Sequence, residues 1–377
     1  MKVALVHDWL TGMRGGEKCL EVFCELYPDA DLFTLVYVPE KISSTIRRMN
    51  VRTSWLDRLP AAAKYFRYFL PLFPYTVERW DLSAYDLVLS SSHCVAKGVL
   101  AREALHVSYV HTPMRYIWDL HGEYFDRVNG YPGTRAGMSF FRSYLQKWDV
   151  QSSKRVDYFV ANSANVAARI ERCYGRSSHV IYPPVEIERF STNAKIEPFY
   201  LIVSALVPYK RIELAVDAFN ALGLPLKIVG GGPLRRRLER RAKANIEFLG
   251  WIDDKKVAEL YASCQALIYP GEEDFGIAPL EAQASGRPVI AFRRGGALET
   301  VVGLGEERSG QSPTGIFFAE QSPASLISAI RAYEHSLDRF EPQLIQAHAA
   351  QFSRARFKKE IAAFVELRLR QYNRRAC

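Results

Sequence analysis

Short apolar runs alternate with helical patterns throughout residues 199–292 of this 377-residue chain. Strands separated by helices form parallel sheets, because each crossover places a helix on one face of the sheet. Ligands of such sheets bind beyond the carboxyl ends of the strands. The alternation predicts a doubly wound α/β domain with its binding residues at that edge. The runs expected to form its strands are 199–204, 226–229, 246–249, 266–269 and 288–292.

The first half of the chain shows the same alternation less regularly, beginning with an apolar strand at residues 3–6. Two prolines and an irregular polar stretch after residue 182 mark a linker. A basic amphipathic helix is expected at the C-terminal end. We therefore expect two Rossmann-like doubly wound domains that face each other across a cleft. Their limits are 1–185 and 186–352, and the final helix, 353–377, packs back on the first domain.

The composition is that of a globular protein, with 48% hydrophobic and 24% charged residues. No run of about 18 apolar residues is present that could span a membrane. Six cysteines without a CxxC pair and eight histidines without an HExxH motif encode neither a disulfide framework nor a zinc site. We expect a cytoplasmic protein with reduced thiols and no bound metal.

The densest cluster of polar and glycine residues is the sequence GEEDFGIAPLEAQASGRP, which holds Glu273 and Glu281 on either side of an expected helix start. At about 1.5 Å per residue, Glu281 lies roughly 7 Å along that helix, so one ligand could contact both carboxylates. The amides of Phe275, Gly276 and Ile277 would lie at the positive end of the helix dipole, which suits a diphosphate. Taken singly, such carboxylates more often have no role in binding: Glu273 would then only favour the helix start, and Glu281 would be an ordinary solvated surface residue.

Two further groups lie at the expected carboxyl edge of the second sheet. Lys210 and Arg211 follow its first strand, and three glycines that include Gly231 follow its second strand. Glycines admit a ligand close to the backbone. A glycine cluster or a single basic residue is weak evidence by itself, because flexible turns and solvated surfaces have the same residues.

The strings SALVPYKR, GGGP, FLGWI, EEDFGIAPLEAQASGRPVIA and GGALETV occur in this order within about 100 residues. Together they resemble the nucleotide-sugar-binding half of retaining glycosyltransferases of family four, which have the GT-B fold. The strings RGGEK, HTPMRY, NSANVAARI and YPPVEIERF extend the resemblance through the first half. These motifs are most similar to those of bacterial mannosyltransferases that build surface polysaccharides. This resemblance implies transfer of a hexose, with GDP-mannose as donor and a lipid-linked saccharide as acceptor.

The resemblance also implies roles for individual residues of the second half. Glu281 would bind the ribose hydroxyls of the donor, and Glu273 the hydroxyls of the transferred sugar. Ionised carboxylates are strong acceptors for such hydroxyl donors. Lys210 and Arg211 would neutralise the diphosphate with fixed charge, so no metal cofactor is expected.

In the first half, Gly15 and Gly16 match the glycine loop that closes over the sugar and phosphate in this family. A turn that simply introduces the next helix is nearly as good an explanation of the two glycines. His111 ends a strand-like run and matches the active-site histidine of the family, which binds the donor sugar. A single histidine is more often structural, but its place at the end of a strand favours a functional role.

The sequence departs from the family pattern at one strand end. Many family members have a Gly-Arg pair there, where this chain has Ser204 and Ala205. Without this arginine, one of the positive side chains expected to bind the diphosphate is missing. Arg211 is the candidate substitute.

Residues 41–79 combine eight Lys or Arg with only two acidic residues, and aromatic residues lie between them. Basic residues beside aromatic ones suit the headgroup zone of an anionic membrane. The segment therefore predicts peripheral contact with the inner face of the cell membrane, where a lipid-linked acceptor would be presented. A helical hairpin whose aromatic residues pack on the first domain explains the pattern equally well.

Other functions fit parts of the sequence. A GT-B-type epimerase or phosphorylase would use a related sugar site. The net charge of +9 invites nucleic-acid binding, but the basic residues are spread over both halves and no recognised binding motif accompanies them. We therefore expect no nucleic-acid partner.

Overall fold

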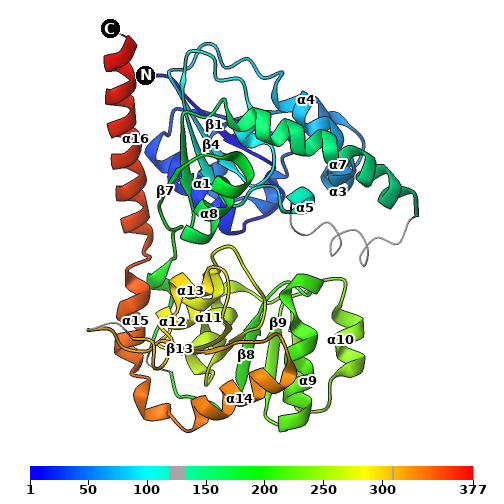
Figure 1. Ribbon diagram of the computed structural model, residues 1–377, viewed down its shortest axis with the longest axis vertical. Helices are drawn as coiled ribbons and strands as arrows, with labels where there is room; N and C mark the ends of the chain where they lie inside the picture. The colour runs from blue at the N-terminus through cyan, green and yellow to red at the C-terminus, as the bar shows by residue number, and fades with distance from the viewer. Residues whose placement is uncertain (119–131, 193, 308–309, 377) are drawn as a thin grey trace. The chain divides into compact units, whose positions relative to one another are not determined.

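The computed structural model describes residues 1–118, 132–192, 194–307 and 310–376 (Figure 1). The chain forms two compact units. The N-terminal unit contains residues 1–184 together with 355–377, and the C-terminal unit contains residues 185–354. The boundaries between the units therefore lie after residues 184 and 354. The sequence analysis predicted them after residues 185 and 352.

The N-terminal unit is built on a seven-stranded sheet with the order β3-β2-β1-β4-β5-β6-β7, and every neighbouring pair is parallel. In the register, His7 lies level with Ser91, and Ser91 lies level with Tyr109. The segments that follow β1, β4 and β5 therefore leave the sheet side by side at its carboxyl edge. The strands are β1 (Val3–His7), β2 (Asp31–Thr34), β3 (Asn50–Thr53), β4 (Leu87–Ser92), β5 (Leu105–Val110), β6 (Tyr158–Ala161) and β7 (Ser178–Val180).

Helices cover both faces of this sheet, since the side chains of a strand point alternately to opposite faces. Leu5 and Leu89 pack with α1 and α16 on one face, while Val6 and Val88 pack with η3, α4 and α7 on the other. Figure 1 shows α16 along the α1 side of the sheet. The helices are α1 (Gly15–Leu26), η1 (Pro39–Lys41), α2 (Ser44–Arg47), η2 (Trp55–Arg58), α3 (Ala62–Tyr65), η3 (Phe66–Leu72), α4 (Phe73–Val77), η4 (Ala96–Gly98), α5 (Arg115–Trp118), α7 (Pro132–Ser153), α8 (Ala164–Tyr174) and α16 (Arg354–Ala376).

The C-terminal unit is built on a six-stranded parallel sheet with the order β10-β9-β8-β11-β12-β13. Its strands are β8 (Tyr200–Val203), β9 (Leu226–Val229), β10 (Ile246–Gly250), β11 (Leu267–Tyr269), β12 (Val289–Phe292) and β13 (Gly315–Phe318). Its helices are η5 (Ile187–Arg189), η6 (Pro208–Lys210), α9 (Ile212–Leu222), α10 (Arg235–Arg241), α11 (Asp254–Ser263), α12 (Ile277–Ala284), α13 (Ala297–Thr300), α14 (Pro323–Glu334), η7 (Leu337–Arg339) and α15 (Pro342–Ala350).

Alternation along the strands divides the core of the C-terminal unit into two layers. Ile202 and Ile268 point to the side covered by α9 and α14, while Leu201 and Leu267 point to the side of α11 and α12. Two doubly wound parallel sheets with helices on both faces confirm the fold predicted from the sequence. The loops after β8, β9 and β11, which hold the predicted donor residues, all leave the carboxyl edge of this sheet.

Residues 41–79 form several short helices rather than one helical hairpin. Phe66, Leu70 and Phe73 are buried in the core of the N-terminal unit, whereas Tyr65 and Tyr68 are exposed. The buried rings pack on the N-terminal unit, as the second interpretation expects, and membrane contact by the exposed rings stays a prediction. Among the helices in the described part of the chain, none combines the length and the apolar character that crossing a bilayer requires.

Candidate active site

Lys210 and Glu273 form an ion pair at the carboxyl edge of the C-terminal sheet. Lys210 ends η6 after β8, and Glu273 lies in the loop between β11 and α12. Their side chains remain 18% and 17% exposed, so both can reach a ligand. An ammonium group has three N–H donors, which allows Lys210 to bind a phosphate oxygen while it still contacts Glu273. The sequence analysis gave the two residues different groups of one donor, the sugar and the diphosphate, and did not foresee this pairing.

The start of α12 has the features that anion binding needs. Gly276 precedes the helix with a φ of 90°, a conformation that residues with a side chain rarely adopt. No side chain caps the helix, so its first turn, which begins at Ile277, presents amides at the positive end of the helix dipole. The preceding loop is fixed by the amide of Gly296, which donates to the carbonyl of Glu273 at 2.8 Å. Phe275 of the same loop is buried.

Glu281 lies in the second turn of α12 and is held by a neighbouring helix. The hydroxyl of Tyr261 on α11 donates to Oε2 of Glu281 at 3.0 Å. Burial raises the pKa of Glu281, although the hydrogen bond from Tyr261 and the charge of Arg189 oppose the increase. Arg189 itself pairs with Glu186 at 3.0 Å and with Asp254 at 3.1 Å. The sequence analysis identified Glu281 but neither Tyr261 nor Arg189.

Arg211 and Gly231 lie in the turns that follow β8 and β9. Arg211 has a left-handed backbone with a φ of 54°, and α9 begins directly after it. Such a conformation is strained for a residue with a side chain, and strain of this kind gathers at functional sites. At Gly231, a Cβ atom would lie 2.5 Å from Nε1 of Trp251, so any side chain at this position would force that indole to move. Trp251 is 81% exposed beside this turn.

His111 follows β5 at the carboxyl edge of the N-terminal sheet. Its Nε2 atom lies 2.9 Å from Oγ of Ser91 at the end of β4. Burial lowers the pKa of His111 well below its usual range, and the neighbouring His93 and His7 lower it further. A Cβ atom at Gly16 would lie 3.5 Å from the same Nε2 atom, so the glycine turn and His111 are neighbours, as a shared ligand would require.

Gly15 and Gly16 are the first two residues of α1 rather than a loop before it. Glu17 caps the N-terminal end of this helix, because its Oε2 atom accepts a hydrogen bond from the amide of Arg14 at 3.0 Å. Burial of Glu17 would raise its pKa, but the adjacent His7 outweighs this effect and the pKa is lowered. Glu17 therefore places a negative charge beside the turn that the sequence analysis assigned to an anionic ligand.

The sequence analysis missed three polar residues at the same edge, His7, Asp8 and His93. His7 is fully buried, and its Nδ1 atom lies 3.1 Å from Oγ of Ser91. Asp8 is also buried and contacts His93. The signal was present in the sequence, because polar residues directly after a buried strand mark the carboxyl edge of a parallel sheet.

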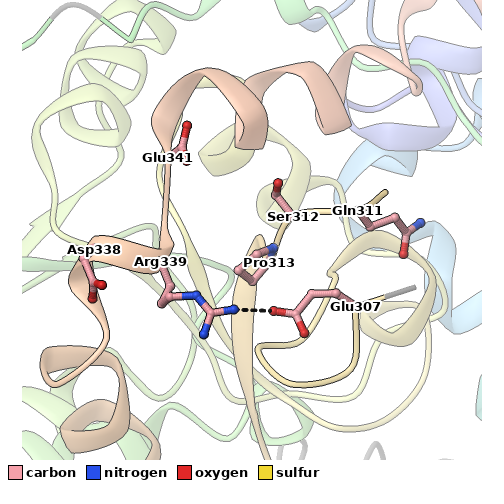
Figure 2. Close-up of a pocket in the computed structure, with 7 residues that line it drawn as sticks. All are labelled: Glu307, Gln311, Ser312, Pro313, Asp338, Arg339 and Glu341. Carbon is pink, nitrogen blue, oxygen red and sulfur yellow. Dashed lines mark ion pairs between the residues drawn. The ribbon is translucent and has the colours of Figure 1, made fainter. Parts of the chain in front are cut away.

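Two surface hollows lie away from the predicted residues. A hollow of about 530 Å³ on the C-terminal unit is crossed by an ion pair of 3.5 Å between Arg339 and Glu307 (Figure 2). A second hollow of about 330 Å³ lies beside Trp118 and Lys147 on the N-terminal unit. Within the described ranges, no three His, Cys, Asp or Glu side chains are grouped so that they could hold a metal ion. The residues lining the first hollow are Glu307, Gln311, Ser312, Pro313, Asp338, Arg339 and Glu341.

Two family models match adjoining parts of the chain. The model for Glycosyltransferase Family 4 matches residues 21–189, and the model for Glycosyl transferases group 1 matches residues 185–347. The chain belongs to the family-four glycosyltransferases. The two matches meet at the boundary between the two units, and they include His111 in one unit and Lys210 in the other.

Individual relatives match shorter parts of this glycosyltransferase. The D-rhamnosyltransferase WbpZ of Pseudomonas aeruginosa is 30% identical over 200 residues, 48% of this chain and 51% of the relative. O-antigen chain mannosyltransferase C of Escherichia coli is 29% identical over 158 residues, 37% of this chain and 43% of the relative. The chain thus spans about half the length, or less, of the curated relatives it matches.

Solved structures match this glycosyltransferase over nearly its whole length. HepE of Anabaena, solved in complex with UDP, has a TM-score of 0.69 and 19% identity, and the match covers 97% of this chain and 100% of that chain. The sucrose-phosphate synthase of Thermosynechococcus elongatus has a TM-score of 0.71 and 18% identity over 97% of this chain and 99% of that chain. At such identities the similarity establishes the fold, which is GT-B.

Proposed function

We propose that this protein is a retaining mannosyltransferase that transfers mannose from GDP-mannose to a hydroxyl of a lipid-linked saccharide in surface polysaccharide synthesis. The observation that carries the proposal is the ion pair of Lys210 and Glu273 beside the uncapped start of α12. A cation, a carboxylate and helix amides together suit the diphosphate and the sugar hydroxyls of one nucleotide sugar. The activities named for the rhamnosyltransferase and the mannosyltransferase among the relatives support hexose transfer, and the second supports mannose.

In the proposed reaction, the acceptor oxygen bonds to the anomeric carbon on the face from which the diphosphate leaves. The bond between that carbon and the phosphate oxygen breaks, and the diphosphate takes the proton of the acceptor hydroxyl. Lys210 and the first amides of α12 stabilise the departing charge without a metal cofactor, so catalysis comes from positioning and electrostatics. Glu273 and His111 bind the transferred sugar, and Glu281 binds the ribose. The remaining proposed donor contacts are Gly15, Gly16, Arg211, Gly231, Phe275, Gly276 and Ile277.

We place the protein in the cytoplasm, in peripheral contact with the anionic inner face of the cell membrane. Tyr65, Tyr68 and Tyr75 of the segment 41–79 are exposed by 43%, 56% and 54%. Lys64 lies over the ring of Tyr65, with 5.1 Å between the ammonium nitrogen and the ring centroid. Rings with an apolar body and a polar tip, next to basic side chains, favour the headgroup zone. The described cysteines are buried and form no disulfides with one another, which supports a reducing compartment.

A nucleotide panel tests the donor. A ligand at a hundred times its dissociation constant adds about 2.7 kcal/mol of stability, which a thermal-melting assay resolves. We expect GDP and GDP-mannose to raise the melting temperature more than UDP or ADP does. Stabilisation by UDP alone would overturn the choice of guanine and mannose, and conversion of the sugar without any acceptor would identify an epimerase instead.

A further inference from the structure

Asp8 organises the turn that follows β4. Its carboxylate accepts hydrogen bonds from four successive backbone amides, those of His93 at 2.7 Å, Cys94 at 2.9 Å, Val95 at 2.6 Å and Ala96 at 2.8 Å. The side chain of Asp8 is fully buried. A carboxylate offers about four lone-pair positions. These four bonds and the neighbouring imidazole therefore saturate Asp8, which leaves it no capacity to bind a ligand of its own.

The same carboxylate fixes the ring of His93. Nδ1 of His93 lies 3.0 Å from Oδ2 of Asp8. Because a carboxylate oxygen only accepts hydrogen bonds, this contact favours the tautomer with the hydrogen on Nδ1 and the lone pair on Nε2. Trp9 packs edge-on against the ring, with 4.4 Å between the ring centroids. Burial lowers the pKa of His93, despite the opposing charge of Asp8, which favours the neutral ring at pH 7. The ring is thus a fixed hydrogen-bond acceptor.

The second ring nitrogen of His93, Nε2, lies on the side of the ring that does not contact the buried carboxylate of Asp8. Asp8 is wholly inaccessible, whereas the side chain of His93 is 24% exposed. Among the residues that the structure describes, none hydrogen-bonds Nε2 of His93. The ring lies beside His111, with 6.5 Å between the centroids, but Nε2 of His111 is already engaged by Ser91. His93 therefore offers an acceptor atom next to the proposed sugar site.

We propose that Nε2 of His93 accepts a hydrogen bond from a hydroxyl of the acceptor saccharide, and that Asp8 is its positioning residue. This inference rests on the proposed function. Saccharides present hydroxyl donors, and a neutral imidazole whose other nitrogen is held by a carboxylate is a directional acceptor for one of them. His93 and Asp8 belong to the N-terminal unit. The acceptor is favoured over the donor because the donor sugar already has His111 and Glu273 as proposed partners, whereas no residue is yet assigned to the acceptor.

Kinetics with two His93 variants test the role. The probes are GDP-mannose as donor and octyl α-mannoside as a soluble acceptor, and hydrolysis of GDP-mannose is followed separately without acceptor. His93→Phe keeps a ring but removes both nitrogens, and His93→Gln restores an acceptor oxygen near the position of Nε2. We expect His93→Phe to raise the KM for octyl α-mannoside about tenfold, the loss of one hydrogen bond, with donor hydrolysis unchanged. His93→Gln should recover most of this loss.

His179→Phe is the matched control, because His179 is an exposed histidine of the same unit whose ring stacks on Phe364. It should leave both reactions unchanged. The proposal is overturned if His93→Phe leaves the acceptor KM at the wild-type value. It is equally overturned if His93→Phe reduces donor hydrolysis as much as transfer, because His93 would then serve the donor or the fold.

A spectroscopic measurement on the wild-type protein separates this inference from the proposed function. In protein with ¹⁵N-labelled histidine, we expect His93 to show a protonated Nδ1 and a bare Nε2, and octyl α-mannoside to shift the Nε2 resonance. If GDP-mannose is not a donor but the resonance still shifts, the proposed donor fails and the saccharide contact stands. No shift of the Nε2 resonance overturns the contact, whatever the donor proves to be.

Discussion

Lys210 and Glu273 illustrate how one contact can serve two purposes. Their ion pair brings together a turn after β8 and a loop after β11, and so fixes both segments at the edge of the sheet. Partly exposed ion pairs contribute little to stability. In the proposed function, the value of this pair lies in positioning an ammonium group and a carboxylate for a ligand that carries a diphosphate and hydroxyl groups.

Replacement of Lys210 tests this assignment. Lys210→Ala should lower turnover about a hundredfold or more, because a positioned donor that stabilises developing charge contributes at least that much. The measurement is release of GDP from GDP-mannose in the presence of acceptor. Lys256→Ala, at a lysine that is 68% exposed on α11, is the control and should keep wild-type turnover. Similar turnover in the two variants would remove Lys210 from the mechanism.

His106 should make stability depend on pH. It is fully buried in β5, with Nε2 at 2.9 Å from Oγ of Ser90, and burial lowers its pKa to about 3. The unfolded chain binds this proton near pH 6.5, whereas the folded chain does not until about pH 3. The contribution of His106 is therefore present in full above pH 6.5 and is lost as the pH falls through that window, by about 2 kcal/mol at pH 5.

Urea unfolding at pH 7 and pH 5 measures this effect. His93 and His111 also have lowered pKa values, so the wild-type protein alone does not isolate His106. The variant His106→Gln should lose about 2 kcal/mol less between the two pH values than the wild type does. Equal losses in the two proteins would show that His106 takes up its proton in the folded state.

At the scale of elements, the short helices of the segment 41–79 bury some of its aromatic rings and expose others. Buried rings such as Phe66 and Phe73 hold the segment to the core, while the exposed tyrosines are free to meet a surface. Basic residues alone give binding that salt weakens. The exposed rings should add an apolar contribution to the membrane affinity that salt does not remove.

Vesicle sedimentation tests this division. The wild-type protein should bind vesicles that contain phosphatidylglycerol at low salt, and replacing Tyr65, Tyr68 and Tyr75 with Ser should weaken the binding at least about tenfold, or 1.4 kcal/mol. Leu344→Ser removes an exposed apolar residue from the C-terminal unit and should have no effect. If the wild-type protein stays in the supernatant at low salt, the membrane contact is ruled out.

The sequence predicted the first five strands of the C-terminal unit within one or two residues. It did not identify β2, β3 and β13. Side chains of β3 alternate between exposed and partly buried, so this strand makes no buried apolar run. In the site, the strand ends located His111, Lys210 and Arg211, whose roles stay predictions. The pairing of Lys210 with Glu273 and of Asp8 with His93 joins residues far apart in the chain, so only the tertiary fold reveals it.

For the molecule as a whole, α16 completes the N-terminal unit from the far end of the chain. Phe357 is fully buried, with ring centroids 6.0 Å from Phe23 and 5.5 Å from Tyr109. Ile361 and Phe364 continue the same contact. The core of this unit therefore depends on residues separated from it in sequence by the whole C-terminal unit.

Phe357→Ala should lower the free energy of unfolding of the N-terminal unit by about 3–5 kcal/mol, the usual loss for a buried ring. Calorimetry should show one transition moving to lower temperature, while the transition stabilised by nucleotide stays in place. Leu367→Ala, at a residue that is 50% exposed on the same helix, should cost no more than about 0.5 kcal/mol. Equal shifts in the two variants would contradict a structural role for the buried face of α16.

This arrangement also sets an order for biosynthesis. Domains generally fold as units while the ribosome makes them from the N-terminus. The C-terminal unit is continuous and is complete once residue 354 has been made, whereas the N-terminal unit lacks Phe357 and its neighbours until the whole C-terminal unit has been made. The unit whose synthesis starts first is thus the later of the two to finish its core, and loss of residues 355–376 would damage the unit to which the first strand belongs.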